Sequence, residues 1–355
     1  MRNLLKNDWT LFVVAIVVSI FTAILTLTNA NAVLTFLVSA IALAILATVV
    51  GESTEQLGNY MGPGATGILQ SAIGNLPELF VSFFALQAGL VTVVQSALVG
   101  SILANSLLVL GLAFFLGGRK NGTQKFKSET PRVIAILMVL AVSALVVPTL
   151  AHSMHTPAAA HEEALSIASA IVLLIVFFAS IPFSLQGGTA TEAVHPKDHV
   201  KKPWSLMRVI SVLAIAGIFA ALVSDWFVKA LEPAIAALGI SQAFAGLVIV
   251  AIAGNAVENI VGVQLALKNK ADYAISVILN SSLQVALALT PILVLLSFFF
   301  TPVALTLVLP PLLVVSLALT AILSALIVYD GESNWLEGLA LIGLYIMIAV
   351  SFWWG

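Results

Sequence analysis

Residues 71–80 read S-A-I-G-N-L-P-E-L-F, and they place an asparagine, a proline and a glutamate within four positions of a strongly apolar segment. A carboxylate at the centre of a membrane-crossing helix costs about 3 kcal/mol on insertion scales, so such a residue usually has a function. The pattern occurs twice, as G-N-L-P-E at 74–78 and again in the second half of the chain as G-N-A-V-E at 254–258. Glycine, asparagine and glutamate in register twice indicate an internal repeat built around two acidic positions.

The composition is that of a multi-span membrane protein. The 355 residues are 61% hydrophobic and 8% charged, whereas a globular domain carries about 25% charged residues. The net charge of −2 gives no reason to expect a nucleic-acid partner, and the absence of cysteine excludes disulfides and thiolate metal sites. Because a membrane-crossing helix needs about 20 apolar residues, we predict an all-α integral membrane protein in contact with lipid, with about 11 transmembrane helices. The predicted spans are 10–28, 33–56, 64–88, 91–116, 131–150, 162–183, 205–228, 242–267, 272–299, 302–328 and 336–354.

The basic residues predict the orientation of these spans. Of the 14 Lys and Arg residues, all but Lys229 fall on one side of an eleven-span arrangement. By the positive-inside rule, we expect a cytoplasmic N-terminus and an outside C-terminus, and the short loops favour a prokaryotic plasma membrane. Arg2, Lys6 and the later Ala30-Asn31-Ala32 also resemble a signal peptide. The apolar run between them is longer than a signal core, so we expect a retained helix.

The repeat extends beyond the two motifs. The shift along the chain that takes Gly74 to Gly254 also superposes other polar and apolar positions, without a gap. These pairs are Val81 and Val261, Ser96 and Ser276, Ser101 and Ser281, Leu103 and Leu283, and Glu52 and Glu232. We therefore predict an N-terminal helix (1–32), a first five-helix repeat (33–184), a cytoplasmic linker (185–204) and a second five-helix repeat (205–355). An odd number of spans inserts the second copy in the opposite direction, and such inverted repeats are common in secondary transporters, whose sites lie near the midplane between the repeats.

The two motif glutamates, Glu78 and Glu258, fall near the middle of their predicted spans and would face each other across the pseudo-two-fold axis. They could serve as interhelical hydrogen-bond glue, but Asn or Ser would do so at lower cost. Pro77 removes a backbone N–H and predicts a kink that frees the carbonyl of residue 73. Carboxylates, amide oxygens and freed carbonyls are ligands for a hard cation such as Ca²⁺, which takes 6–8 oxygens. The predicted metal ligands are Glu78, Glu258, Asn75 and Asn255, with Gly74, Pro77 and Gly254 shaping the backbone around them.

The paired carboxylates also suggest how transport is coupled. Two negative charges are neutralised by one divalent cation or by two protons, but not by both at once. Mutual exclusion at one site, combined with alternating access, gives antiport. We expect Ca²⁺ and H⁺ as transported ions and no cofactor; the sequence leaves the oligomeric state open.

Other polar residues are weaker candidates. Ser101, Asn105, Ser281 and Gln284 would either line the cavity or simply bond neighbouring helices. Glu52, Glu55 and Glu232 would be vestibule carboxylates or solvated charges at helix ends. His152, His155 and His161, with Glu162 and Glu163, would form a weak metal or pH-sensing patch or, as we favour, a solvated loop.

At these residues the sequence resembles the calcium/proton exchanger (CAX) family of the calcium/cation antiporter superfamily. The resemblance covers nearly the whole chain and includes G-E-S-T-E (51–55), the segment around the first motif (62–86), A-G-N-A-V-E-N (253–259) and S-V-I-L-N-S-S-L-Q-V-A-L-A-L-T-P (276–291). It implies one helix plus two inverted five-helix repeats, and cation and proton binding by Glu78 and Glu258. It also implies that the spans at 33–56 and 205–228 slide to open the two sides alternately.

The chain departs from the family pattern at three places. Leu-Pro precedes Glu78 where the family usually has Ala and one further residue, and Asn259 stands where a histidine often follows the second glutamate. The acidic segment between the halves is reduced to Glu192 and Asp198. These departures leave a proton-handling role for residue 259 in doubt, and they predict no strong acidic regulatory patch.

Three other functions can be weighed against calcium/proton exchange. Sodium/calcium exchange needs further ligands, and the first motif segment offers Ser71 and Ser82 but no second carboxylate. A cation channel could use an acidic ring, but it does not need inverted repeats. A membrane enzyme has little support, because the chain has no H-E-x-x-H, no G-x-S-x-G and no cysteine, and its histidines lie in predicted loops.

Overall fold

The computed structural model describes residues 8–61, 73–127, 129–186 and 204–355. In the first half the elements are α1 (Asp8–Leu27), α2 (Ala32–Gly58), α4 (Leu76–Gln87), α5 (Val91–Leu103), η1 (Ala104–Val109), α6 (Leu110–Asn121), β1 (Gln124–Lys125), α7 (Glu129–Ser153), η2 (Pro157–His161) and α8 (Glu162–Gln186). In the second they are α10 (Leu206–Leu238), α11 (Gln242–Phe244), η3 (Ala245–Val250), α12 (Ala251–Gly254), α13 (Ala256–Leu267), α14 (Ala271–Gln284), η4 (Val285–Leu289), α15 (Thr290–Phe300), α16 (Pro311–Ile327), β2 (Glu332–Ser333) and α17 (Trp335–Ser351). The segments η1, η3 and η4 are π-helical, and η2 is a 3₁₀ helix.

The helices are long and apolar enough for an integral membrane protein. Among the described residues, seven helices could cross a membrane by length and composition, or eight if one bent pair counts as a single span. Three shorter apolar helices, α4, α16 and α17, lie on the remaining predicted spans. The prediction of an all-α membrane protein is confirmed.

The elements recur at the spacing of the sequence repeat. The shift that takes Gly74 to Gly254 carries the bounds of α4 onto those of α13, and it carries Gly58, the end of α2, onto Leu238, the end of α10. The long helix through α5, η1 and α6 corresponds in the same way to the one through α14, η4 and α15. Both contain a π-helical segment that ends at the equivalent residue, although η4 begins one residue later than the shift of η1 would place it. The repeat seen in the sequence is therefore a repeat of structure.

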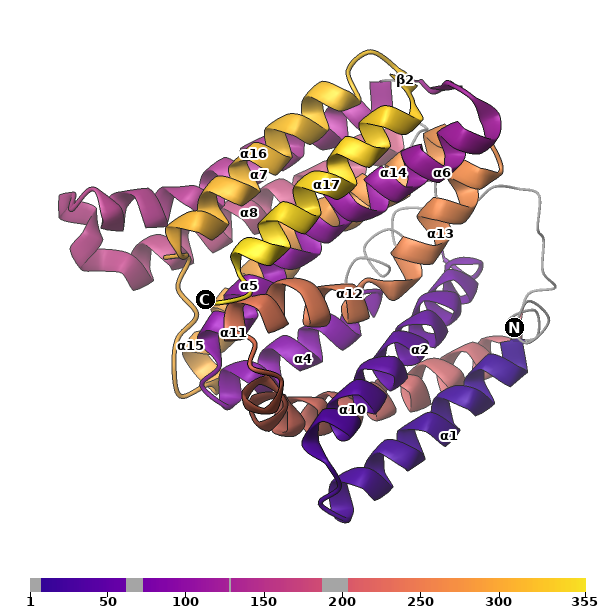
Figure 1. The fold of residues 1–355 in the computed structure, drawn as a ribbon, viewed down its shortest axis with the longest axis vertical. Helices are drawn as coiled ribbons and strands as arrows, with labels where there is room; N and C mark the ends of the chain where they lie inside the picture. Colours follow the sequence, from indigo (N-terminus) through magenta and orange to yellow (C-terminus); the bar gives the residue numbers. More distant parts are fainter. Residues whose placement is uncertain (1–7, 62–72, 128, 187–203) are drawn as a thin grey trace.

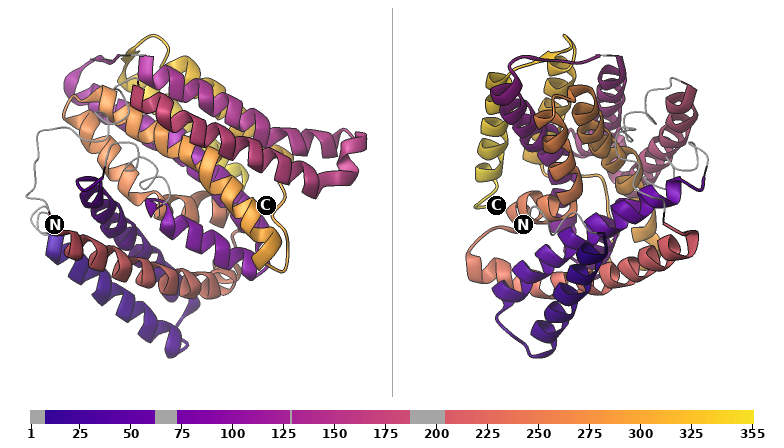
Figure 2. Two further views of the ribbon diagram at one scale, coloured as in Figure 1. Left: turned by 180° about the vertical axis from the view of Figure 1, so that it is seen from behind. Right: turned by 90° about the vertical axis from the view of Figure 1, so that its right-hand side faces the viewer.

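Three helices form a layer beside the rest of the molecule. Figure 1 shows α1, α2 and α10 side by side, apart from the larger group that contains α5 to α8 and α13 to α17. The view from behind in Figure 2 shows the same separation. Phe36 of α2 stacks on Phe227 of α10 with ring centroids 4.8 Å apart, and both rings are fully buried. The motif helices α4 and α13 touch this layer, α4 through α10 and α13 through α2.

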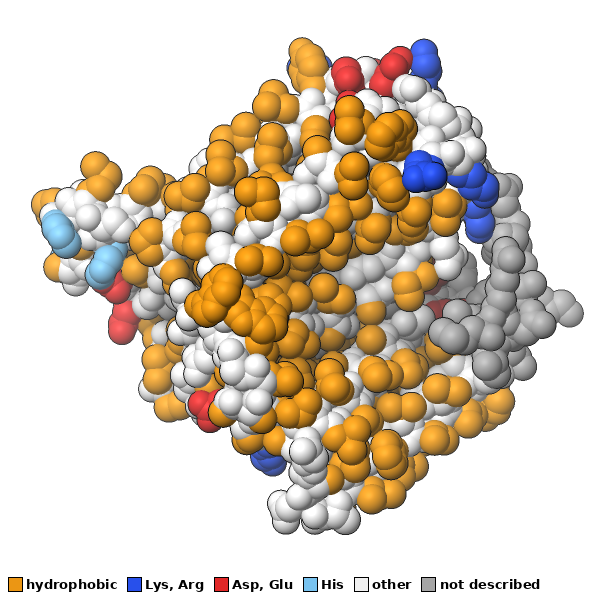
Figure 3. Space-filling model, in the orientation of Figure 1, with side chains coloured by type: hydrophobic (Ala, Val, Ile, Leu, Met, Phe, Trp, Pro, Cys, Tyr) orange, Lys and Arg blue, Asp and Glu red, His pale blue; other side chains and the backbone are white. Residues whose placement is uncertain are grey.

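The connections after α6, α13 and α16 meet at one end of the molecule. Strand β1 pairs antiparallel with β2, and Lys125 forms an ion pair with Glu332 at 3.1 Å. Lys120 donates to the carbonyl of Leu267 at 2.9 Å, at the end of α13. Figure 3 shows the lysines and arginines mostly gathered toward this end and the histidines at the opposite one. The orientation of the chain in the membrane stays a prediction.

Two predicted span boundaries are wrong. The span predicted from 302 begins only at Pro311, because proline disfavours helix in the residue before it: Thr301 and Pro310, each followed by proline, have extended ψ angles of 153° and 136°. The span predicted to end at 228 continues to Leu238. The charge on Lys229 does not stop it, since Lys229 pairs with Asp225 one turn earlier at 2.6 Å.

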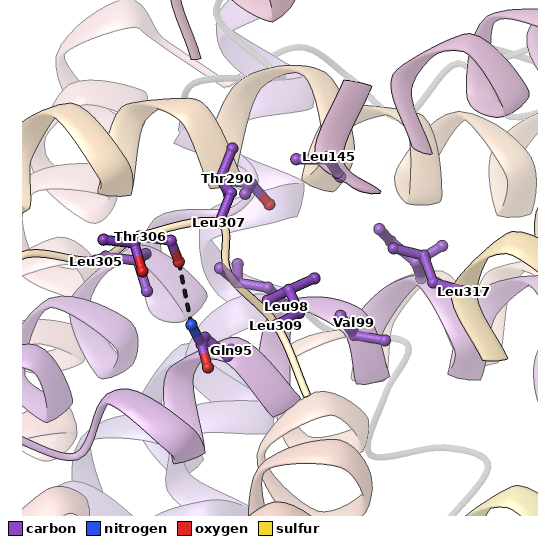
Figure 4. A pocket seen from close by; sticks show the side chains of 11 residues that line it. Gln95, Leu98, Val99, Leu145, Thr290, Leu305, Thr306, Leu307, Leu309 and Leu317 are labelled. Atoms are coloured by element: carbon purple, nitrogen blue, oxygen red, sulfur yellow. Dashed lines mark hydrogen bonds between the residues drawn. The ribbon is translucent and has the colours of Figure 1, made fainter. Parts of the chain in front are cut away.

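The extended segment 301–310 is held by polar side chains from several helices. Gln95 of α5 donates to the carbonyls of Thr306 (3.1 Å) and Val308 (3.0 Å), and Figure 4 shows the first of these bonds beside a small, mainly apolar cavity. Thr149 of α7 donates to the carbonyl of Leu307 at 2.9 Å. Non-helical backbone is tolerated at membrane depth only where protein satisfies its polar groups, and these side chains do so here.

Candidate cation site

Both motif segments break at the motif asparagine. Asn75 precedes α4 with φ −94° and ψ 20°, and Asn255 precedes α13 with φ −89° and ψ 22°. In the second repeat the helical axes on either side of the break, Gln242–Gly254 and Asn259–Leu267, differ by 62°. The predicted spans 64–88 and 242–267 are therefore not continuous helices through their motifs. Gly74 and Asn75 lie in a turn, not on one helix face with Glu78.

Pro77 does not kink the interior of a helix, as the sequence suggested. It lies in the first turn of α4, where its missing N–H has no helical partner to lose. The equivalent position in α13 is Val257, yet the backbone breaks at Asn255 with nearly the same angles. The break therefore does not depend on proline, and the sequence common to both breaks is Gly-Asn.

The first motif glutamate lies against the second motif glycine. Glu78 is 7% exposed and sits in the first turn of α4, where the helix dipole favours a negative charge. A Cβ added to Gly254 would lie 2.6 Å from Cγ of Glu78 and 3.2 Å from its Oε1. The carboxyl group therefore occupies space that exists only because residue 254 is glycine. The two motifs, one from each half of the chain, meet at this point.

Glu258 is the third residue of α13, as Glu78 is the third residue of α4. Its side chain lies outside the described part of the structure. So do Ser71 and the linker carboxylates Glu192 and Asp198. The predicted pairing of the two motif glutamates across the axis stays a prediction.

The second motif asparagine joins both repeats. Asn255 donates through Nδ2 to Oγ of Ser101 at 3.0 Å, and its Oδ1 accepts from Nδ2 of Asn105 at 2.9 Å. Ser281 donates to the same Oδ1 at 3.4 Å and accepts from Asn105 at 3.0 Å. The structure thus brings three of the weaker sequence candidates into contact with a motif residue.

The first motif asparagine is held from the opposite repeat. Asn75 donates through Nδ2 to Oε1 of Gln284 at 3.4 Å. Gln284 is the last residue of α14, directly before the π-helical segment η4, and Asn105 lies inside the equivalent segment η1. Each repeat therefore supplies one amide side chain to the motif asparagine of the other.

Sequence reasoning missed two residues of this region. Ser106 and Ser282 are buried and share a hydrogen bond of 3.0 Å between their hydroxyl groups. Ser106 lies within the π-helical segment η1, and Ser282 directly follows Ser281 in α14. The only signal in the sequence was a hydroxyl group within an apolar segment.

Close backbone contacts fix the helices that carry these side chains. A Cβ on Gly100 of α5 would lie 2.3 Å from the carbonyl oxygen of Leu247 in η3. A Cβ on Gly246 would lie 2.4 Å from the carbonyl oxygen of Val93. The two glycines let α5 cross η3 at backbone contact, and Gly100 directly precedes Ser101.

The remaining candidates lie at the margins. Glu52 is half-buried on α2, while Glu55 and Glu232 are exposed on α2 and α10. His152 contacts Glu162 in the exposed α7–α8 connection. Within the described residues, no three His, Cys, Asp or Glu side chains are grouped so that they could hold a metal ion.

The chain is similar over nearly its whole length to known ion exchangers. The family described as "Sodium/calcium exchanger protein" matches residues 31–186 and 208–354, one stretch in each half. A Ca²⁺/H⁺ antiporter of Aphanothece halophytica is 36% identical over 335 residues, covering 89% of each chain. The Ca²⁺/H⁺ antiporter ChaA of Bacillus subtilis is 35% identical over 323 residues, covering 89% of this chain and 91% of its own. The solved structure of native YfkE superposes with a TM-score of 0.82 at 31% identity, covering 97% of this chain and 99% of its own.

Proposed function

The chain belongs to the sodium/calcium exchanger protein family, and we propose that it exchanges Ca²⁺ for H⁺ across a membrane. Two relatives named Ca²⁺/H⁺ antiporters share 35% and 36% of its residues over about nine-tenths of each chain. A protein of this kind is a secondary transporter, not an enzyme. The proposed direction is export of Ca²⁺ from the cytoplasm of a prokaryotic cell, driven by protons moving inward.

The observation that carries the proposal is the position of Glu78. Its buried carboxyl group lies on Gly254, at the point where the second motif breaks. At such a break, helix ends, carboxylates and amide groups can be directed at one ion, as in transporters with discontinuous helices. The proposed ligands are Glu78, Glu258 and the amide oxygen of Asn75, completed by hydroxyl groups or water.

Exchange follows from competition at this site. Ca²⁺ needs the charge of both glutamates, whereas two protons remove that charge, so either ion species excludes the other. The layer of α1, α2 and α10 offers a way to change access, since α10 packs on α4 of the first repeat and α2 on α12 and α13 of the second. A movement of the α2–α10 pair along these contacts would expose the site to one side and cover it from the other.

The topology belongs to the same proposal. The connections after α6, α13 and α16 meet at one end and include Lys120 and Lys125. We place this end, and with it the N-terminus, in the cytoplasm.

Sodium as the counter-ion is the second candidate, and ion-gradient experiments separate the two. The purified protein in liposomes would be given a proton gradient, a sodium gradient or neither, and ⁴⁵Ca²⁺ uptake measured. Uptake with the proton gradient alone is expected. Uptake that requires sodium would overturn the proton assignment while leaving the site in place.

The glutamates are tested in the same liposomes. Glu78→Gln and Glu258→Gln keep the shape of the side chain and remove the charge, so each is expected to abolish uptake without loss of folded protein. Glu332→Gln is the matched control, because Glu332 is an exposed carboxylate paired with Lys125, and uptake should be unchanged. Normal exchange in both site variants would remove the glutamates from the mechanism.

A further inference from the structure

Both the amide nitrogen and the amide oxygen of Asn255 have hydrogen-bond partners. The residue is fully buried, and its Nδ2 donates to the carbonyl of Ala251 at 2.9 Å and to Oγ of Ser101 at 3.0 Å. Its Oδ1 accepts from Asn105 at 2.9 Å and from Ser281 at 3.4 Å. An amide group has two N–H donors and two acceptor lone pairs, so all of its capacity is used. An oxygen that already accepts two hydrogen bonds has no lone pair left for a cation.

The network also fixes which way each amide faces. The carbonyl of Ala251 can only accept, so the NH₂ group of Asn255 must face it and Oδ1 must face Asn105. Asn105 must then donate, which turns its NH₂ group toward Asn255 and Ser281. The Oδ1 atom of Asn105 therefore points away from Asn255 and Ser281. That oxygen is buried, and no donor among the described residues reaches it.

A buried acceptor without a donor destabilises the folded protein, and a cation or a cation-bound water would satisfy it. We propose that Asn255 is a positioning residue that binds no cation itself and orients Asn105, whose Oδ1 is the oxygen offered to the transported ion or its water. This inference rests on the proposed function, because it concerns the same site. It replaces the expectation, drawn from the symmetry of the motifs, that Asn255 is a ligand equivalent to Asn75.

The two motif asparagines are thereby given different tasks. Asn75 donates to Gln284 over a longer distance of 3.4 Å, and its amide oxygen lies on the branch away from Gln284. The first repeat then contributes Glu78, Asn75 and Asn105 to the ion, whereas the second contributes Glu258 and the frame that orients Asn105.

A double-mutant cycle tests this division. Calcium binding to the purified full-length protein would be measured by calorimetric titration for Asn105→Ala, Asn255→Ala and the double variant. If Asn255 acts through Asn105, each single change weakens binding about tenfold, and the double change weakens it by little more than either. Losses that multiply to about a hundredfold would show an independent contact of Asn255 with the ion and overturn the proposal.

Two measurements on the same samples distinguish a positioning role of Asn255 from a purely structural one. The melting temperature without calcium reports folding, and the dissociation constant reports the site. Asn255→Ala with a lower melting temperature but an unchanged dissociation constant would overturn the positioning role. If Asn255→Ala does not fold, Ser281→Ala replaces it. The serine change should weaken binding about threefold in the native background and not at all beside Asn105→Ala, and an equal loss in both backgrounds would count against the proposal.

Glu78→Gln, measured in parallel, keeps the two proposals apart. Loss of calcium binding in this variant supports the site itself. Retained binding would overturn the proposed function, whatever the cycle at Asn105 and Asn255 shows. If the losses caused by the two asparagine substitutions multiply in the double variant while Glu78→Gln loses calcium binding, only the positioning role of Asn255 is overturned.

Discussion

Replacing Gly254 with alanine should weaken calcium exchange strongly while leaving the protein folded. The new Cβ would lie 2.6 Å from Cγ of Glu78, whereas ordinary contacts begin near 3.4 Å, so the glutamate must retreat by about 0.8 Å. A calcium–oxygen bond is about 2.3–2.6 Å long, and a shift of this size would remove the carboxylate from the proposed coordination. We expect the calcium concentration for half-maximal exchange to rise at least about tenfold.

The cost to stability should be small, because a side chain and not backbone has to move. An off-rotamer glutamate costs about 0.5–1.5 kcal/mol, and alanine in place of glycine at the end of α12 recovers up to about 1 kcal/mol. The net change in unfolding free energy is therefore expected to stay within about 1 kcal/mol. Weakened calcium exchange with nearly unchanged stability would distinguish Gly254→Ala from an ordinary packing defect, which lowers stability.

Two other glycines serve as matched controls in detergent melting and liposome uptake. A Cβ on Gly217 of α10 would have no atom within 4 Å, so alanine there should leave both stability and exchange intact. A Cβ on Gly100 would strike the backbone of Leu247 at 2.3 Å, which cannot yield unless α5 and η3 separate. Overpacking of this kind costs about 1–3 kcal/mol or more, and the melting temperature should fall. Normal calcium affinity and exchange in Gly254→Ala would refute the placement of Glu78 as the cation's ligand.

Three further substitutions probe the frame of the molecule. Gln95→Ala leaves the partly buried carbonyls of Thr306 and Val308 without this donor, so the free energy of unfolding should fall by about 1 kcal/mol in thermal melting, with calcium affinity unchanged. Asn334→Ala removes the capping box of α17 and should cost about 1 kcal/mol by the same measurement. Lys125→Met breaks an ion pair whose side chains are 78% and 48% exposed, and a change in melting temperature that exceeds the measurement error would contradict the small value expected of such pairs.

Most of the architecture could be predicted from the sequence, because the bilayer imposes one rule. Every backbone polar group inside the membrane must be satisfied within the protein, so apolar runs of sufficient length become helices. The boundaries failed where side chains, not the helix itself, satisfied the backbone. Gln95 and Thr149 bind the carbonyls of an extended apolar segment that hydropathy alone assigns to a helix. Conversely, Lys229 did not end α10, because a neighbouring carboxylate compensates its charge.

The candidate site was predictable in its residues but not in its contacts. Polar residues are conspicuous in an apolar sequence, and this made it possible to find Ser101, Asn105, Ser281 and Gln284. The sequence could not predict which of these side chains contact one another, because contacts between the repeats depend on how the helices cross. The approach of Glu78 to Gly254 needs a backbone break and a missing side chain, and the sequence shows only the glycine.

The repeat holds without a gap, yet the amides that bind the two motif asparagines do not sit at equivalent positions. Asn105 would correspond to residue 285 and Gln284 to residue 104, where the chain has Val285 and Ala104. Both positions lie at the start of a π-helical segment, where the wider turn alters which residues face the opposite repeat. Gln284 is one methylene longer than Asn105, which lets it reach Asn75 from one position earlier. Two halves related by one repeat thus hold their motif asparagines by different side chains, Gln284 for Asn75 and Asn105 for Asn255. We therefore expect an ion at the proposed site to meet an asymmetric set of ligands, although the two motifs are nearly identical.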